Sequence, residues 1–301
     1  MKKIVENRYE HSATLFKFCK EALKIRYSGS VKVIDQDVGA LLGYDPADCS
    51  HWKKGKKNIR TLANFRSIAD YLGVDQSLVI DMVFGKVSLE EGVFEYKGYA
   101  DFELTDSQVE AYRKDFFQNP SRWNNDYGQR DFDELFNLDR NAIGEIANKV
   151  ISQMQLTEPA VQIDDVFALF DNIKVTINAE QEKPVKTIYH SLQSRSVECV
   201  LSCKEFPNRP YLRFLVAKEL YKFLVFSQHE LVEAMPKCPS DMLDVQGNFF
   251  AGSLLIPRAM LLQEVNLIDS SIDFIDQLAS IFQVSKLVMN RRMQDYLVYK
   301  V

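Results

Sequence analysis

The chain has 301 residues, of which 46% are hydrophobic and 26% charged, and its formal net charge is −5. This composition excludes a disordered or fibrous chain and predicts two globular domains, since one domain takes roughly 100–200 residues. No apolar run approaches the ~18 residues that a membrane-spanning helix needs, and none follows the lysines at the N-terminus. We therefore expect a protein that does not enter a membrane.

The cysteines indicate the compartment. They are five in number, they are scattered, and no two form a C-x-x-C pair. An odd, scattered set is typical of reduced thiols and not of a disulfide framework, so we expect a cytoplasmic protein. The five are Cys19, Cys49, Cys199, Cys203 and Cys238.

Charge is distributed unevenly along the chain. Residues 1–86 hold 15 Lys and Arg against 10 Asp and Glu, whereas the remainder is acidic. A mildly basic N-terminal part is compatible with one module that faces nucleic acid.

Helical spacing and capping residues predict four helices in the N-terminal part. The first covers residues 12–26, with Ser12 as its N-cap. The second covers 35–42 and stops at Gly43, and the third covers 46–53, with Pro46 at its first position. The fourth covers 61–72, is capped by Thr61 and ends at Gly73.

Two short helices joined by a tight turn are the elements of a helix-turn-helix, and Gly39 supplies the small residue that a close approach of their axes requires. The arrangement "DQDVGALLGYDPADCSHWKKGKK" resembles the Cro/XRE repressor family over residues 12–84. The resemblance rests on Val38, Gly39, Leu42, Gly43, Ser50, Trp52, Gly55, Leu62, Ile68, Ala69, Leu72 and Val74. It implies an all-α DNA-binding domain over residues 1–86 that acts as a homodimer on double-stranded DNA.

The same resemblance implies roles for the residues of helix 46–53. Base edges would be read by Ala47, Asp48, Ser50 and His51, and phosphates would be bound by Lys53, Lys54, Lys56 and Lys57, with Arg60 beside them. Asp35 stands where the family often has a phosphate-contacting glutamine, and it implies a low affinity per monomer. The alternative is a small helical bundle in which KKGKK is a solvated turn.

Residues 87–139 are acidic and rich in aromatic residues. This composition predicts a connector that packs against another folded surface and is not a disordered tether. A helix is predicted from Ser107 to Gln118. The sequence leaves open whether the connector packs on a neighbouring domain or on a second subunit.

From residue 140 the pattern predicts helices and a few strands: helices near 140–154, 163–173, 211–227 and 243–255, strands at 174–178 and within 186–203, and a helical pair within 271–297. The order of these elements and the motifs they carry resemble those of the ImmA/IrrE zinc metallopeptidases over residues 140–300. The matching segments are "RFLVAKELYK", residues 213–222, then Asp244 with Gly247, Asn248, Phe250 and Ala251, and "LLIP", residues 254–257. The resemblance implies a zincin-like α+β domain over 140–301, and hence a mostly helical α+β chain.

The chemistry departs from that family. Lys218 and Lys222 stand where the family has its two zinc-binding histidines, and a lysine ammonium has no lone pair to offer a metal. Asp244 matches the third ligand with one methylene fewer, and Glu219 matches the general base. We therefore expect no catalytic residue, no metal and no cofactor. His190 and His229 remain as other candidate ligands, with His229 and Glu233 one helical turn apart.

Two interpretations of Lys218, Glu219, Lys222 and Asp244 stay open: salt bridges that lock the former site, or a site for a small anionic effector. The function expected is a sequence-specific transcriptional regulator with an inactive peptidase-like domain for sensing or dimerisation. The alternatives are an active metallopeptidase that cleaves a repressor, and an antitoxin-type or phage-type protein-interaction module.

Overall fold

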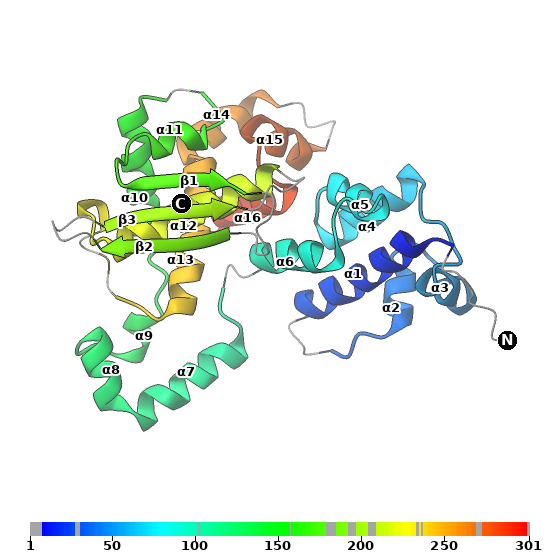
Figure 1. The fold of residues 1–301 in the computed structure, drawn as a ribbon, viewed down its shortest axis with the longest axis horizontal. Coiled ribbons are helices and arrows are strands. Elements are labelled where there is room, and N and C mark those ends of the chain that lie inside the picture. The colour runs from blue at the N-terminus through cyan, green and yellow to red at the C-terminus, as the bar shows by residue number, and fades with distance from the viewer. Residues whose placement is uncertain are drawn as a thin grey trace. The chain divides into compact units, whose positions relative to one another are not determined.

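The protein is described by a computed structural model, which divides into two compact units, Met1–Ala100 and Asp101–Val301 (Figure 1). The described residues are 8–27, 31–100, 103–156, 158–178, 185–191, 197–203, 209–232, 235, 237–268 and 273–299. Most of them are helical and one three-stranded sheet lies in the second unit, which confirms a mostly helical α+β chain.

Unit 1 is all helical where it is described. Its elements are α1 (Glu10–Arg26), α2 (Asp35–Ala40), α3 (Pro46–Lys53), α4 (Leu62–Leu72), α5 (Gln76–Val83) and α6 (Leu89–Ala100). The predicted signals hold at α4: Thr61 accepts the N–H of Asn64, and Gly73 is left-handed with φ of 72°. At α3, which has the predicted bounds, Asp45 accepts the N–H of Asp48. These are contacts between near neighbours in sequence, so a local pattern is sufficient to predict them.

The predicted N-cap of the first helix is wrong. Helix α1 already begins at Glu10, and Ser12 lies inside it and is buried. Its hydroxyl accepts the N–H of Ile59 at 3.1 Å, and its carbonyl accepts the indole N–H of Trp52 at 2.8 Å. Ser12 therefore joins α1 to α3 and to the segment after it, because a serine can satisfy a buried donor as well as it can cap a helix.

The first unit extends beyond residue 86, where the sequence had placed a domain boundary. Helix α6 packs against α1, and its Tyr96 is buried with its ring edge-on to Phe18 at 6.2 Å. The aromatic segment 87–139 is thus divided between the two units, at Ala100. Aromatic content predicted that the segment packs, but not that its two halves pack on different cores.

The aromatic residues of the second half pack on one another. Helices α7 (Asp106–Gln118), α8 (Pro120–Tyr127) and α9 (Phe132–Leu135) carry them. The buried Trp123 contacts the rings of Phe116, Tyr112 and Tyr127 at centroid distances of 5.6, 6.1 and 5.2 Å. This cluster belongs to unit 2 and gives these three short helices a small core of their own.

The rest of unit 2 combines helices with the sheet. Its elements are α10 (Arg140–Met154), α11 (Ile163–Phe167), β1 (Ile173–Ile177), β2 (Val185–Ser191), β3 (Val197–Cys203), α12 (Arg209–Phe226), the 3-10 helix η1 (Glu230–Val232), α13 (Ser240–Leu255), α14 (Arg258–Leu267), α15 (Phe274–Phe282) and α16 (Lys286–Tyr299). Helix α11 is shorter than predicted and α13 begins three residues earlier, directly after Pro239.

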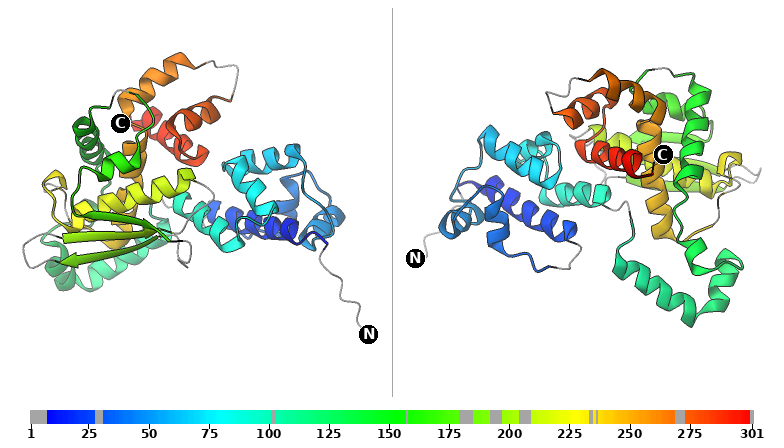
Figure 2. Two further views of the ribbon diagram at one scale, coloured as in Figure 1. Left: turned by 45° about the horizontal axis from the view of Figure 1, so that its top comes forward. Right: turned by 180° about the vertical axis from the view of Figure 1, so that it is seen from behind.

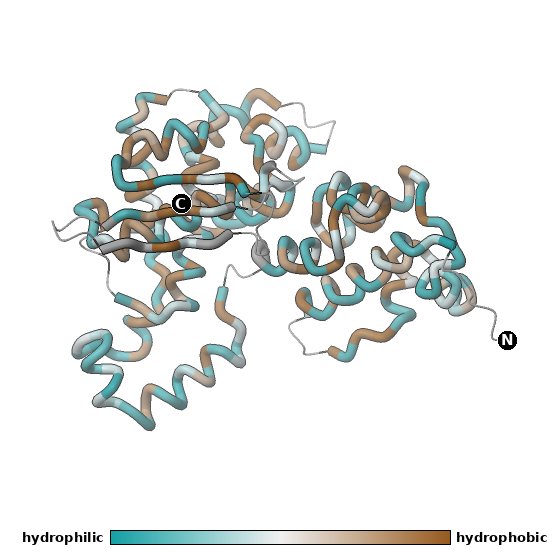
Figure 3. Tube along the Cα trace, viewed as in Figure 1, coloured by the Kyte–Doolittle hydropathy of each residue, from teal (hydrophilic) through white to brown (hydrophobic). Residues whose placement is uncertain are grey.

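The sheet has the order β1-β3-β2, with β1 parallel and β2 antiparallel to the central β3. Helix α12 lies against the sheet and contacts β2 and β3, and α13 and α10 stack behind it (Figure 2). Helices of both units alternate between hydrophobic and hydrophilic residues along their length (Figure 3), as expected of elements with one buried face. Four cysteines whose side chains are described are free thiols. Among the described helices, none has the length and apolar character needed to cross a membrane.

Candidate functional site

Helices α2 and α3 meet at a glycine. A Cβ added to Gly39 would lie 3.0 Å from Cβ and 3.1 Å from Sγ of Cys49, so a larger residue would push the two helices apart. The turn between them passes through Gly43, whose φ is 63°, and the N–H of Tyr44 donates to the carbonyl of Gly39 at 3.0 Å. The pair therefore forms the tight corner that its sequence predicts.

Trp52 holds α3 in place from its inner side. Its side chain is fully buried, donates to the carbonyl of Ser12 and lies edge-on to the rings of Phe16 at 5.2 Å and Tyr44 at 5.9 Å. Cys49, one turn earlier, is buried as well. Because these two residues face the core, the opposite side of α3 is left toward solvent.

The residues expected to read bases differ in exposure. Ala47 and His51 are exposed, whereas Asp48 and Ser50 are half-buried. All four lie on the eight-residue helix that the sequence predicts over 46–53. Of the four, Ala47 and His51 are the more accessible to a partner.

The four predicted lysines gather at the C-terminal end of α3, where cations are favourable for the helix dipole. Lys53, Lys54 and Lys56 are exposed and Lys57 is half-buried. Lys57 Nζ lies 2.7 Å from Asp48 Oδ2 and 3.9 Å from the centre of the Tyr44 ring. Lys53 Nζ lies 2.6 Å from Asp35 Oδ2, so two of the four ammonium groups already have a carboxylate partner.

The second predicted group of charges, in unit 2, forms a network that we call the Lys–Asp network: Lys218, Glu219, Lys222 and Asp244. Lys218 and Lys222 of α12 place their Nζ atoms 2.9 and 2.7 Å from Oδ1 of Asp244 on α13. Lys222 Nζ also lies 2.9 Å from Glu219 Oε1. Glu219 Oε2 accepts the hydroxyl of Thr187 on β2 at 2.8 Å, which ties the network to the sheet.

Protonation in the network follows from its pairing. Burial alone would raise the pKa of Asp244, but Lys218 and Lys222 outweigh it and hold that pKa below its ordinary value. Burial alone would lower the pKa of Lys222, but Glu219 and Asp244 outweigh it and raise that pKa. Asp244 is therefore ionised and Lys222 protonated at neutral pH.

These residues do not fit a catalytic zinc ion. Zinc needs ligands with a lone pair, and the ammonium of Lys222 is a protonated donor directed at two carboxylates. Among the described residues, no group of three or more His, Cys, Asp or Glu is placed to hold a metal ion. His229 is described and lies edge-on to Phe170, whereas Glu233 and the side chain of His190 lie outside the described residues.

The charges of the Lys–Asp network cancel: two ammonium groups meet two carboxylates, and each ammonium has a carboxylate partner. The side chains of Lys218 and Lys222 are only 13% and 22% exposed. A neutral, closed network leaves no excess positive charge for an anion. Of the two interpretations left open by the sequence, this geometry favours salt bridges that close the site.

Sequence reasoning missed one residue of this site, Thr187, and the packing role of a second residue that the motif already contained. Thr187 could not be assigned because its partner Glu219 is 32 residues away and no motif joins them. Gly247 is the second. A Cβ there would lie 3.1 Å from Lys218 Cγ and 3.3 Å from the Lys218 carbonyl, so this glycine makes room for the lysine between α12 and α13. The signal in the sequence was a glycine within a motif helix, because two closely spaced helices need a small residue between them.

A pair of glycines on α13 tests this packing. Gly247→Ala adds a methyl group where Lys218 must yield, whereas at Gly252 no described atom lies within 4 Å of the added Cβ. Both changes raise helix propensity by up to about 1 kcal/mol. We expect Gly252→Ala to stabilise and Gly247→Ala to be at least about 1 kcal/mol less stable than Gly252→Ala, measured by denaturant unfolding. Equal stabilities would show that Lys218 does not fill this space.

Neutralising Asp244 tests the network itself. Asp244→Asn takes its carboxylate partner from Lys218 and leaves Lys222 with Glu219. We expect it to lower the free energy of unfolding by about 1–2 kcal/mol, a value reduced because Asp244 is partly exposed. The double variant Lys218→Met with Asp244→Asn restores neutrality and should recover much of that loss. If the double variant is no more stable than Asp244→Asn, the balance of charges does not stabilise the network.

The same variant has a signature in pH. Because the folded-state pKa of Asp244 is lowered, its contribution to stability is present above the ordinary aspartate pKa and is lost as pH falls through the lowered value. We expect the acid loss of stability to be shallower in Asp244→Asn than in the natural chain.

The fold and these sites define a mostly helical α+β chain in which a helix pair with a lysine-rich end and a closed Lys–Asp network lie in separate units. Comparisons with protein-family models, with curated proteins and with solved structures found no match.

Proposed function

We propose that the chain is a sequence-specific DNA-binding transcriptional regulator that acts in the cytoplasm as a homodimer. One observation carries the proposal: α3 is anchored by Trp52 on its inner side, its Ala47 and His51 are exposed, and four lysines lie at its last residue and in the turn after it. A helix of this kind, joined to α2 at a glycine corner, has the form of a Cro/XRE-type recognition helix. Exposed lysines beside such a helix are suited to phosphates, and its outward side chains to base edges.

A selection from random DNA tests this function. The full chain would be incubated with a pool of random duplexes at about 50 mM and about 200 mM salt, and bound DNA sequenced. We expect an enriched motif with twofold symmetry and half-sites about one helical turn apart, as a homodimer requires. Absence of binding at the lower salt concentration would refute the function and favour the protein-interaction module instead.

For unit 2 we propose a peptidase-like scaffold of the ImmA/IrrE type that does not hydrolyse peptides and that serves dimerisation. The closed and neutral Lys–Asp network supports a structural role over the binding of an anionic effector. Metal analysis of the chain after dialysis against zinc provides the test, with less than stoichiometric zinc as the expected result. One zinc ion per chain that is lost in Asp244→Ala, together with cleavage of a polypeptide, would establish the active metallopeptidase.

A further inference from the structure

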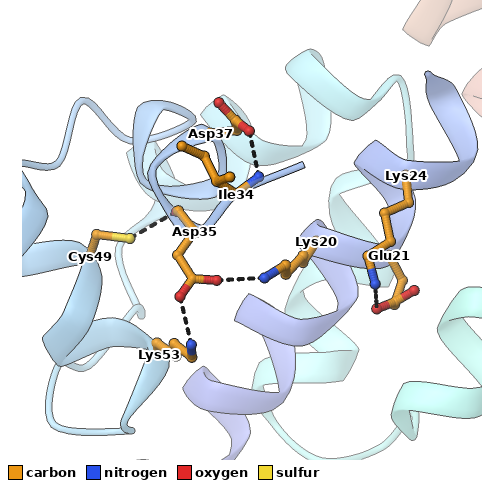
Figure 4. A network of polar contacts seen from close by, with 8 residues as sticks. All are labelled: Lys20, Glu21, Lys24, Ile34, Asp35, Asp37, Cys49 and Lys53. Carbon is orange, nitrogen blue, oxygen red and sulfur yellow. Dashed lines mark hydrogen bonds and ion pairs between the residues drawn. The ribbon is translucent and has the colours of Figure 1, made fainter. Parts of the chain in front are cut away.

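Asp35 is held by lysines from two different helices. It is the first residue of α2, and its Oδ1 lies 2.6 Å from Lys20 Nζ on α1 while its Oδ2 lies 2.6 Å from Lys53 Nζ on α3 (Figure 4). The backbone carbonyl of Asp35 also accepts the thiol of Cys49 at 2.9 Å. The carboxylate is thus fixed beside the end of the recognition helix, with both its oxygens occupied by ammonium groups.

The carboxylate is ionised at neutral pH. The hydrogen bond from Lys20, and then the one from Lys53, holds the pKa of Asp35 below its ordinary value, and burial opposes this only in part. A phosphate that binds Lys53 must therefore either displace this carboxylate or accept its repulsion at close range.

The Asp48–Lys57 pair repeats the arrangement. Lys57 Nζ is 2.7 Å from Asp48 Oδ2, so Lys53 and Lys57, two of the four lysines at the end of α3, are each paired with a carboxylate of the same helix pair. Lys54 and Lys56 are exposed, and no ion pair to either is seen among the described residues. Two of these four lysines are thus already neutralised within the protein.

We propose that Asp35, with Asp48 in support, is an internal competitor for DNA phosphate that sets the affinity of unit 1 for DNA and keeps it low for a single subunit. This inference rests on the proposed DNA-binding function. Low affinity per subunit makes occupancy depend on two subunits binding together, because the second contact is then intramolecular. The competing carboxylates would thereby make stable binding a property of the dimer on a two-half-site operator.

The test measures binding of the full chain to a random-sequence duplex of about 20 base pairs, which presents phosphates without an operator, between about 50 and about 200 mM salt. Asp35→Asn frees Lys20 and Lys53, and we expect binding at least about threefold tighter and a slope of log affinity against log salt steeper by about one unit. Asp48→Asn should act in the same direction, but less, because Lys57 is also held over the Tyr44 ring.

Asp70→Asn is the matched control. Asp70 belongs to α4 of the same unit, pairs with Arg66 at 3.5 Å, and its change alters the net charge equally. If Asp35→Asn binds DNA no tighter than Asp70→Asn does, the proposal is overturned. If Asp35→Asn binds DNA more weakly than the natural chain does, Asp35 positions the lysines and does not compete with phosphate. Thermal unfolding of each variant shows whether the fold is kept, and Asp48→Asn tests the same competition if Asp35→Asn does not fold. If the natural chain and all variants fail to bind at the lowest salt, the DNA-binding function itself is refuted, and this inference with it.

Discussion

Replacing Trp52 by alanine is expected to lower the stability of unit 1 by about 3–5 kcal/mol, the usual cost of truncating a buried tryptophan. The ring is fully buried between Phe16 and Tyr44 and also donates the hydrogen bond to Ser12. Its loss leaves a cavity between α1 and α3 and a buried carbonyl without its donor. Because α3 is held through this side chain, DNA binding should fail in the same variant.

Hydrogen exchange measured on peptides of residues 10–86 would report this loss locally. Trp52→Phe is the control: it keeps a buried six-membered aromatic ring and removes the N–H donor with the five-membered ring, so a smaller cost of about 1–3 kcal/mol is expected. Exchange in Trp52→Ala that matches the natural chain would show that α3 is held by other contacts, and the structural basis of the recognition helix would then be wrong.

The second large effect concerns the lysines at the end of α3. Changing Lys53, Lys54 and Lys57 together to alanine removes Lys54, which has no ion pair among the described residues, and the two lysines that balance Asp35 and Asp48. We expect affinity for all DNA sequences to fall by about one order of magnitude at moderate salt. The slope of log affinity against log salt should flatten by about one unit, since each phosphate contact contributes about 0.9 and Lys53 and Lys57 are already paired with Asp35 and Asp48. Filter binding or fluorescence anisotropy over a range of salt concentrations measures both quantities.

Three lysines elsewhere in unit 1 provide the matched control. Lys17, Lys24 and Lys86 are exposed and lie outside α2 and α3, so changing them to alanine removes the same charge with little loss of affinity. Ser50→Ala and His51→Ala should instead alter which sequence is preferred, at about 1–3 kcal/mol for a base pair read by two hydrogen bonds. Equal losses of DNA affinity in the two lysine sets would show that α3 is not part of the DNA interface.

Much of unit 1 could be predicted from sequence because its signals are local. The bounds of α3, the cap at Thr61 and the helix stop at Gly73 all depend on contacts within about one helical turn. The glycine at position 39 likewise predicted the close approach of α2 and α3, because no other residue leaves as much room. The candidate reading face followed from these elements, since the buried Cys49 and Trp52 fix which side of the helix remains outside.

Other features could not be predicted, because they depend on partners that are distant in sequence. Ser12 has the sequence pattern of a helix cap, but its hydroxyl accepts the N–H of Ile59, which is 47 residues away. The aromatic segment divides at Ala100 because α6 packs against α1.

The charges show the same division. By itself the sequence determined that positions 218 and 222 are lysines, and the chemistry of an ammonium group excludes them as metal ligands. Only the tertiary structure decided that Lys218 and Lys222 meet on Asp244, and that Asp35 lies between Lys20 and Lys53. The reason is physical: a residue type fixes which interactions a side chain can make, but an ion pair needs its two atoms within a few ångströms, and that distance is set by how whole helices pack.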